Sequence, residues 1–443
     1  MRVLFTSLAH HTHYYPLVPL AWALRTAGHE VRVASQPELT DVITGTGLAA
    51  VPIEWSLGPV EELGLLGRLH DEAAAHAQGF DYAARGEHPW SWEELLRLET
   101  VMVPTLLTAL NNDTMVDSLV DFARSWQPDL VVWETFTLAG AVTARATGAA
   151  QARLLSGPDI AVRARQEFLR LRAAQEPEHR EDPTAEWLGA TLHRLGCAEG
   201  FSEDLVTGQW TIDTTPPSTR LELGLPTVQV RHVPYNGPSV VPDWLRVHPP
   251  RARICVTLGA SGSDVGIGMA DLLQALAALD AEIVATADDE TRARSGELPG
   301  NVRLVDFVPL NDLLPTCAAV VHHGGVGTKA AAELHGVPQL ILAFGWDTEV
   351  MGRRLADIGA GLCVTSSEIT PDLLHKQTER LITDPSFAAG ARRLQEEMLG
   401  VPSPNEAVPV LERLVAEHRG PAAPGLDGSS TGARQYLLRS DRG

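Results

Sequence analysis

The sequence predicts an α/β protein in which two halves of similar design each contain a parallel sheet. Apolar segments of strand length alternate with segments of helical periodicity, an order typical of parallel sheets with right-handed crossovers. The alternation stops at a proline-rich segment, residues 236–253, and then starts again. The length of 443 residues suits two domains at a soft prior of ~150 residues each. We expect a ligand site in a cleft between the halves, at the carboxyl ends of the strands.

The composition is that of a globular protein with a strongly acidic charge balance. Hydrophobic residues make up 44% of the chain and charged residues 21%, which allows complete cores. With 35 Lys and Arg against 56 Asp and Glu, the formal net charge is −21. This charge repels nucleic-acid backbones and anionic membranes, so we expect neither as a partner. An anionic ligand must then be held by local groups.

The cysteines and the N-terminal segment predict a cytoplasmic protein. The four cysteines are far apart and form no CxxC pair of the kind that zinc or redox sites use. Residues 1–31 lack the continuous apolar centre and small-residue cleavage site of a signal peptide. No stretch reaches the roughly 18 uncharged apolar residues that a membrane helix needs.

The first elements form a strand, helix, strand unit. A buried strand is expected over Arg2 to Ser7, followed by a loop rich in His and Tyr. The next helix has apolar residues on one face: Leu17, Leu20, Ala21 and Leu24. It ends at Gly28, and a second strand follows over Glu30 to Ala34.

The middle of the first half is less regular. Residues 56–100 mix acidic residues, His and Trp in short helical pieces. Irregular insertions of this kind are where contacts with substrates or partners usually lie. Periodicity returns with a helix over 114–125, a strand over Leu130 to Trp133 and a helix over Leu138 to Ala146. The charged, proline-bounded segment 176–187 is expected to be a solvated loop.

The second half repeats the same order. The expected strands are Arg253 to Leu258, Glu282 to Ala287, Val302 to Val308, Ala319 to His322 and Gln339 to Phe344. Helices are expected over 268–279 and 328–335, with further helices to about residue 418. The predicted organisation is a domain over 1–235, a linker over 236–252, a domain over 253–418, and a Gly/Pro/Ser-rich tail over 419–443 that is expected to be disordered.

The most specific motif is the sequence VVHHGGVGTKAAAELHGVP, residues 320–338. Free amides at the start of its helix, with the positive end of the helix dipole, favour an anion, and the glycines let a phosphate approach. It is neither a Walker loop nor a good dinucleotide fingerprint, because the GK[ST] order and a placed acidic ribose ligand are missing. Tight strand-to-helix turns need glycine in any case. The doubled His favours a diphosphate, with His323 as a donor to one phosphoryl oxygen.

Two further turns face the same cleft. AFGWDTE, residues 343–349, follows a strand end, so Trp346 and Asp347 are expected to project toward the ligand. The Asp347 carboxylate could accept hydrogen bonds from ligand hydroxyls or cap the next helix, and both are possible together. In LGASGSDVGIG, residues 258–268, Ser261 could line the diphosphate, although a flexible hinge explains the glycines about equally well.

In the first half, HHTHYYP at residues 10–16 places three His just after the first strand. Metal ligation by them is not favoured, because no nearby carboxylate or Cys completes a set. A single His as general base fits better, since its pKa suits removal of a hydroxyl proton at neutral pH. A loop His bonded to backbone is the alternative. Glu134, at the end of a strand, is placed to orient such a His, to act as base itself or to cap a helix.

These residues resemble a known family. The HHGG-x-GT turn, the WD pair and the His after the first strand are similar to GT-B glycosyltransferases that act on antibiotics, over about residues 1–418. The resemblance is closest to bacterial deoxysugar transferases that modify polyketide aglycones, and it extends to four longer segments: residues 7–31, 177–188, 208–213 and 235–245. It implies two Rossmann-like domains, with a TDP-deoxysugar on the C-terminal one and the aglycone on the N-terminal one.

The resemblance also implies roles for individual residues. His13 matches the general base of the family, and Asp347 matches the acid that contacts the sugar. The positions that match the diphosphate-binding turns are His323, Gly325, Gly327 and Thr328, with Ser261 in the loop before it. One departure is that Thr348 follows Asp347 where many relatives have Gln. Loss of this amide removes a hydroxyl contact, which fits a deoxygenated sugar.

The implied mechanism is an inverting displacement without a metal ion or another cofactor. His13 takes the acceptor proton, Glu134 holds its imidazole, and His323 with helix amides stabilises the leaving diphosphate. Close relatives commonly need an auxiliary protein, a haem-free homologue of haem-thiolate monooxygenases. Residues 56–100 are our hypothesis for that contact.

For the acceptor, an aromatic anthracycline aglycone is preferred over a macrolide, with an L-aminosugar such as rhodosamine or daunosamine and with aklavinone as an example. Tyr14 and Tyr15 would stack on the planar ring, although a macrolide pocket could use them too. Three other functions are alternatives. A nicotinamide oxidoreductase would require glycines after the first strand, and a sugar-nucleotide epimerase would need no aglycone pocket. A non-catalytic scaffold would not depend on His13.

Overall fold

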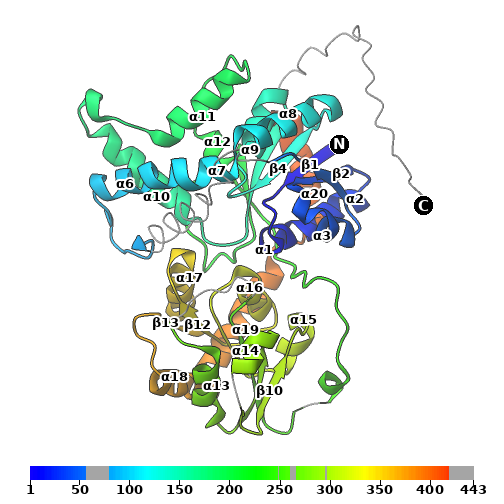
Figure 1. Ribbon diagram of the computed structural model, residues 1–443, viewed down its shortest axis with the longest axis vertical. Helices are drawn as coiled ribbons and strands as arrows, with labels where there is room; N and C mark the ends of the chain where they lie inside the picture. The colour runs from blue at the N-terminus through cyan, green and yellow to red at the C-terminus, as the bar shows by residue number, and fades with distance from the viewer. Residues whose placement is uncertain (56–78, 248, 260–265, 295–296, 419–443) are drawn as a thin grey trace, which may run out of the picture.

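Two parallel sheets, one in each half of the chain, organise this computed structural model (Figure 1). The structure describes residues 1–55, 79–247, 249–259, 266–294 and 297–418. In both sheets the paired strands are parallel, and helices cover the faces. The predicted α/β class with two parallel-sheet domains is therefore confirmed.

The N-terminal sheet has seven strands in the order β3-β2-β1-β4-β5-β6-β7. Its strands are β1 (Arg2–Thr6), β2 (Glu30–Ser35), β3 (Ala49–Pro52), β4 (Leu130–Glu134), β5 (Ala150–Leu155), β6 (Trp210–Asp213) and β7 (Thr227–Gln229). The C-terminal sheet has six strands in the order β10-β9-β8-β11-β12-β13. Its strands are β8 (Ala252–Thr257), β9 (Ala281–Thr286), β10 (Val302–Val305), β11 (Ala319–His322), β12 (Gln339–Ala343) and β13 (Gly361–Thr365). In each sheet the order reverses at the first strand, β1 or β8, which is typical of doubly wound folds.

The helices connect successive strands. Those of the first half are α1 (His11–Tyr14), α2 (Val18–Thr26), α3 (Thr40–Gly45), α6 (Trp92–Met102), α7 (Thr108–Leu110), α8 (Asp113–Trp126), α9 (Ala139–Thr147), α10 (Ile160–Ala173), α11 (Pro183–Arg194) and α12 (Asp204–Thr207). Those of the second half are α13 (Met269–Ala277), α14 (Asp289–Arg294), α15 (Leu310–Leu313), α16 (Val326–Leu334), α17 (Trp346–Asp357), α18 (Pro371–Thr383), α19 (Pro385–Gly400) and α20 (Pro404–His418). Helices α11, α18 and α19 each begin at a proline. The side chain directly before that proline caps the helix, and these capping residues are Asp182, Thr370 and Asp384.

Most expected elements are present with ends shifted by a few residues, and the largest differences have local causes. The strand expected to reach Val308 ends at Val305 as β10. The segment after β1, expected as a loop, contains the short helix α1 because the His10 side chain accepts a hydrogen bond from the Thr12 N–H and caps it. The charged loop at 176–187 contains the start of α11 at Pro183.

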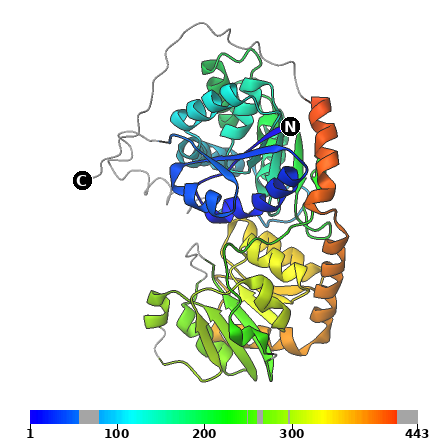
Figure 2. The same ribbon diagram turned by 90° about the vertical axis from the view of Figure 1, so that its right-hand side faces the viewer.

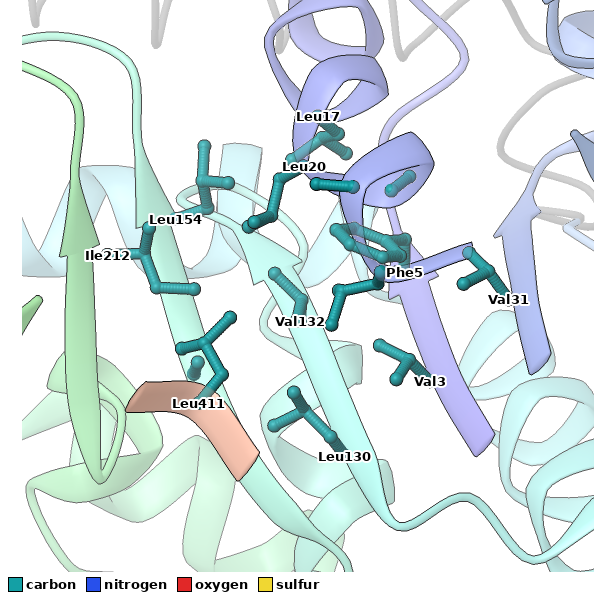
Figure 3. Close-up of a cluster of buried hydrophobic side chains, with 14 of the residues drawn as sticks. Val3, Phe5, Leu17, Leu20, Val31, Leu130, Val132, Leu154, Ile212 and Leu411 are labelled. Atoms are coloured by element: carbon teal, nitrogen blue, oxygen red, sulfur yellow. The ribbon is translucent and has the colours of Figure 1, made fainter. Parts of the chain in front are cut away.

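The N-terminal core lies on one face of the first sheet, between the strands and two helices that are distant in sequence (Figure 3). Phe5 of β1 and Val132 of β4 are fully buried there. Leu17 and Leu20 cover them from one side, and Leu411 of α20 packs on the same layer. The last helix of the chain therefore belongs to the packing of the first domain.

This placement of α20 links the two halves. Figure 2 shows α19 along the C-terminal domain and α20 along the N-terminal domain, on the same side of the molecule. Four side chains of α20 are buried in the N-terminal core: Ala407, Val408, Leu411 and Val415. Residues 404–418, which the sequence groups with the domain over 253–418, thus pack on the other domain.

The proline-rich connection is anchored at both ends. At its start the ring of Tyr235 packs edge-on against Tyr15, with centroids 5.0 Å apart. Near its end the ring of Trp244 contacts the guanidinium groups of Arg253 and Arg303, which lie 5.3 and 4.9 Å from its centroid. These contacts hold the connection against both domains.

Candidate active site

The candidate site lies where the carboxyl ends of the two sheets meet, beside α1, α16 and α17 (Figure 1). In the first sheet β1 neighbours β4, and in the second β8 neighbours β11, so both sheets contribute residues at the point where strand order reverses. Such positions are where open α/β sheets bind ligands. His13 follows β1, Glu134 ends β4 and His323 follows β11.

His13 and Glu134 form a pair in the N-terminal domain. The Nδ1 atom of His13 lies 3.2 Å from Oε2 of Glu134. Two further groups hold the buried carboxylate: the Phe136 N–H donates to Oε2 at 3.0 Å, and the Thr137 hydroxyl donates to Oε1. With Nδ1 on the carboxylate, Nε2 is the nitrogen that can accept a proton.

The electrostatics of this pair suit a general base. Burial lowers the pKa of His13, but the hydrogen bond and charge of Glu134, with the charge of Asp347, outweigh it and raise this pKa above 6.5. Burial raises the pKa of Glu134, and the hydrogen bonds from His13, Thr137 and the Phe136 amide reverse that effect, so the pKa is lowered overall. Glu134 is therefore an anion that orients the imidazole.

The other two histidines of the segment have different surroundings. His10 Nδ1 lies 2.6 Å from the Thr12 hydroxyl, and the His10 and His11 rings stack with centroids 4.9 Å apart. Burial and the neighbouring histidines lower the pKa of both. In the described part of the chain, no three His, Cys, Asp or Glu side chains come together as they would around a metal ion.

The two tyrosines of this segment differ in burial, since Tyr14 is buried and Tyr15 is half-buried. Tyr14 is 0% exposed in the N-terminal core, and its hydroxyl lies 2.6 Å from that of Thr46. Burial raises its pKa to about 12. The proposed role of Tyr14 in acceptor binding is therefore wrong, because the helical turn of α1 directs its ring inward. Tyr15 packs on Tyr235 of the interdomain connection.

In the C-terminal domain the turn between β11 and α16 surrounds His323 with glycines. An added Cβ at Gly259 would lie 2.3 Å from Cε1 of His323, and one at Gly325 would lie 2.6 Å from its Nε2. Gly324 has a φ of +91°, which strongly favours glycine. Burial lowers the pKa of His323, so the ring is neutral and can donate one N–H.

His322 has a structural role that the sequence did not reveal. Its Nδ1 accepts the Gly324 N–H at 3.1 Å, and its Nε2 lies 2.9 Å from Oε1 of Gln339. Burial lowers its pKa to about 3, so it remains neutral and fixes the turn. Gly327 and Thr328 lie in the first turn of α16, whose amides have no partners within the helix. Ser261 lies outside the described residues.

Trp346 and Asp347 begin α17 and face the other domain. The cap position is Gly345, so Asp347 is the second residue of the helix rather than its cap. Oδ2 of Asp347 would lie 3.1 Å from a Cβ added at Gly157, in the loop after β5. Burial raises the pKa of Asp347 to about 6, against the opposing charges of Lys329 and His13.

An aromatic surface that the sequence did not reveal extends from the His13 ring across both domains. Phe136 lies edge-on to His13 at 5.5 Å between centroids and to Trp346 at 6.4 Å. Trp346 stacks on Tyr82 at 6.2 Å. Beside them is a cavity of about 260 Å³ lined by Gly79, Phe80, Asp81, Tyr82, Ala83, Gly345, Trp346 and Glu349. The sequence analysis placed Trp346 in the cleft, but it gave no signal for Tyr82, and for Phe136 it offered only the position two residues after the end of β4.

Comparison with known families and proteins gives matches over nearly the whole chain. The family described as Erythromycin biosynthesis protein CIII-like matches with its N-terminal domain over residues 22–259 and with its C-terminal domain over residues 270–414. The 10-deoxymethynolide desosaminyltransferase of Streptomyces venezuelae is 53% identical over 427 residues, which is 96% of this chain and 99% of that protein. The aklavinone 7-beta-L-rhodosaminyltransferase of Streptomyces galilaeus is 48% identical over 442 residues, with 96% and 98% covered.

Solved structures agree with these relatives. Glycosyltransferase VinC in complex with DTDP is similar with a TM-score of 0.83 and 40% identity, over 94% of this chain and 100% of VinC. The spinosyn forosaminyltransferase SpnP follows with a TM-score of 0.76 and 40% identity, over 94% and 99%. The predicted GT-B fold is confirmed by these likenesses. Among the residues described here, no helix is both long and apolar enough to cross a membrane.

Proposed function

The chain belongs to the erythromycin biosynthesis protein CIII-like glycosyltransferases, and on this premise we propose that it moves a deoxyaminosugar from a TDP-sugar to a hydroxyl of a polyketide aglycone. One observation carries the proposal: the His13–Glu134 pair of one domain lies within electrostatic reach of Asp347 of the other, and the helix that follows the His323 turn begins with Val326 against the loop after β5. A base and an anion site on opposite sides of a cleft are what a transfer from a nucleoside diphosphate requires.

The proposed reaction is a single inverting displacement. The acceptor oxygen attacks the anomeric carbon while Nε2 of His13 takes its proton, and the bond to the TDP oxygen breaks. Glu134 stabilises the imidazolium that forms. The N–H of His323 and the first amides of α16 stabilise the charge that develops on the diphosphate, a part that a metal ion takes in other enzymes.

For the acceptor, two classes have support. The aromatic surface from Phe136 to Tyr82 fits a flat polycyclic aglycone, as does the similarity to the aklavinone transferase. The sequence argument for an anthracycline aglycone was stacking on Tyr14 and Tyr15, and it is weaker because Tyr14 lies in the core. We place a macrolactone first, because identity is higher to the 10-deoxymethynolide transferase, at 53% against 48%.

We also propose a dependence on the auxiliary protein that the resemblance implies. The hypothesis that residues 56–100 contact it concerns a segment of which residues 56–78 lie outside the described part of the chain. Alanine scanning of exposed residues over 85–100, outside the cavity lining, should reduce partner-dependent turnover and leave partner-independent turnover unchanged. Unchanged partner-dependent turnover in every variant would sink this hypothesis.

The experiment for the proposed function is a transfer assay with product detection by mass spectrometry. Purified protein is incubated with TDP-desosamine or TDP-rhodosamine and with 10-deoxymethynolide or aklavinone, with and without an auxiliary protein. We expect a glycoside mass in at least one combination, and turnover lower by ~10² or more with His13→Ala. A scaffold would stimulate a partner equally well with either variant, and that result would contradict the proposal.

A further inference from the structure

Helix α17 makes a second contact with the N-terminal domain, far from the residues that begin it. Arg354, near the end of α17, donates from Nε to the carbonyl oxygen of Thr219 at 2.7 Å. Its second guanidinium nitrogen donates to the carbonyl oxygen of Arg220 at 2.6 Å. These carbonyls lie in the loop after β6, and Thr219 is buried there. Two hydrogen bonds from one planar group fix direction as well as distance.

The start of the same helix fits closely against the neighbouring loop, the one that follows β5. A Cβ added at Gly157 would lie 3.1 Å from Oδ2 of Asp347 and 3.2 Å from a methyl carbon of Val326 in α16. The backbone of Gly157 does not have a positive φ. Glycine is therefore needed here for its lack of a side chain and not for its backbone conformation. Residue 157 therefore sets how closely the two domains can approach.

Between these two contacts α17 is packed into the first domain. Val350 is 5% exposed in a cluster that includes Tyr82, Leu95 and Leu98 of the N-terminal half. Trp346 and Arg354 are eight residues apart, or about 12 Å along a helix. A rigid helix held at Arg354 cannot tilt without moving Asp347.

We propose that Arg354 is a positioning residue for the transfer reaction, which holds α17 on the loop after β6 so that Asp347 sits against Gly157 and across from His13. This inference rests on the proposed function, because it assigns Arg354 a part in that same site. Reacting groups that lie about 1 Å out of place can lose ~10²-fold in rate. The diphosphate turn belongs to β11 and α16, so TDP itself does not need the Arg354 contact.

The test compares Arg354→Ala with Arg353→Ala. Arg353 is the matched control because it lies next to Arg354 on α17, is exposed, and pairs with Glu349 of the same helix. Arg354→Ala should lower kcat by about 10-fold to 100-fold, with the Kd for TDP within about twofold of wild type. Arg354→Lys, which can donate to these carbonyls from one point, should recover part of the loss. Arg353→Ala should have the kcat of wild type.

A second variant reaches the same geometry from the other end. Gly157→Ala keeps the Arg354 contacts but adds a methyl group against Asp347 and Val326. It should also lower kcat. Because Val326 begins the helix of the diphosphate turn, TDP affinity is compared for Arg354→Ala alone. Equal kcat in wild type, Arg354→Ala and Gly157→Ala would overturn the proposal, and so would a loss of TDP affinity in Arg354→Ala as large as its loss of kcat.

Hydrogen exchange separates this proposal from the proposed function. In the free protein, amides of α17 should exchange faster in Arg354→Ala than in wild type, while Arg353→Ala should resemble wild type. If no glycoside forms with any substrate but exchange in α17 rises, the function fails and the anchoring role stands. If transfer occurs and exchange in α17 is unchanged in Arg354→Ala, the anchoring role fails.

Discussion

At the scale of single residues, the chemistry rests on His13 and on what surrounds it. The sequence could place a His after the first strand and a Glu at the end of another, since both follow from the strand pattern. It could not place Phe136, Trp346 and Tyr82 on one surface, because three segments distant in sequence meet only in the folded chain. The predicted role of Tyr14 in acceptor binding is wrong because the helical turn of α1 directs the Tyr14 ring into the core.

The pH dependence of transfer should report the His13–Glu134 pair. A base must be neutral to take a proton, so kcat/KM should fall as the pH falls through the pKa of His13. Because this pKa is raised, the acid limb should lie above pH 6.5. Glu134→Gln removes the charge that raises it, so the limb should move to lower pH while kcat falls by ~10². A pH profile of the variant with the same acid limb as wild type would contradict this pairing.

The burial of Tyr14 predicts a change in stability without a change in transfer. Tyr14→Phe removes the hydrogen bond to the Thr46 hydroxyl, which itself still donates to the Ile43 carbonyl. The free energy of unfolding should fall by about 1 kcal/mol in urea titrations, with kcat/KM within about twofold of wild type. A raised KM for the acceptor at unchanged stability would return Tyr14 to the acceptor site.

At the scale of elements, one of the longer segments that resemble the family, residues 177–188, stabilises the packing of two helices. In the segment 177–188, Asp182 caps α11 and binds Arg165 through two hydrogen bonds of 2.7 and 2.9 Å. Both side chains are about 95% buried, and each has a further charged partner: Arg165 lies 2.8 Å from Glu203, and Asp182 lies 3.5 Å from Arg172. The sequence predicted a solvated loop here, and it missed both the start of α11 at Pro183 and the ion pair that joins α10 to α11.

The turn between β11 and α16 allows two glycines to be compared. A Cβ at Gly327 would meet nothing within 4 Å, so Gly327→Ala should raise the free energy of unfolding by about 0.5–1 kcal/mol. If a phosphate approaches this turn, the same methyl group should weaken TDP binding by about 10-fold. Gly325→Ala should weaken it by displacing His323. Calorimetric titration that shows wild-type TDP affinity in both variants would place the diphosphate elsewhere.

At the scale of the whole molecule, the chain is two doubly wound domains joined at more places than its sequence indicates. The repeated strand and helix order predicted the two halves, because strand burial and helix periodicity are local properties. The return of α20 to the first domain was not predictable, since the apolar pattern of a helix predicts that one face is buried but not which domain buries it. The contacts of α17 with the loops after β5 and β6 likewise depend on how the domains meet.

The measurement that tests the central claim most directly is the thermal stabilisation of this protein by TDP, UDP and NAD at equal concentration. A ligand at ~100 times its Kd adds about 2.7 kcal/mol to the free energy of unfolding. A transferase that uses a TDP-sugar should be stabilised by TDP more than by UDP and not by NAD, and His13→Ala should keep the TDP effect while losing turnover. Stabilisation by NAD, or by no nucleotide, would contradict the account.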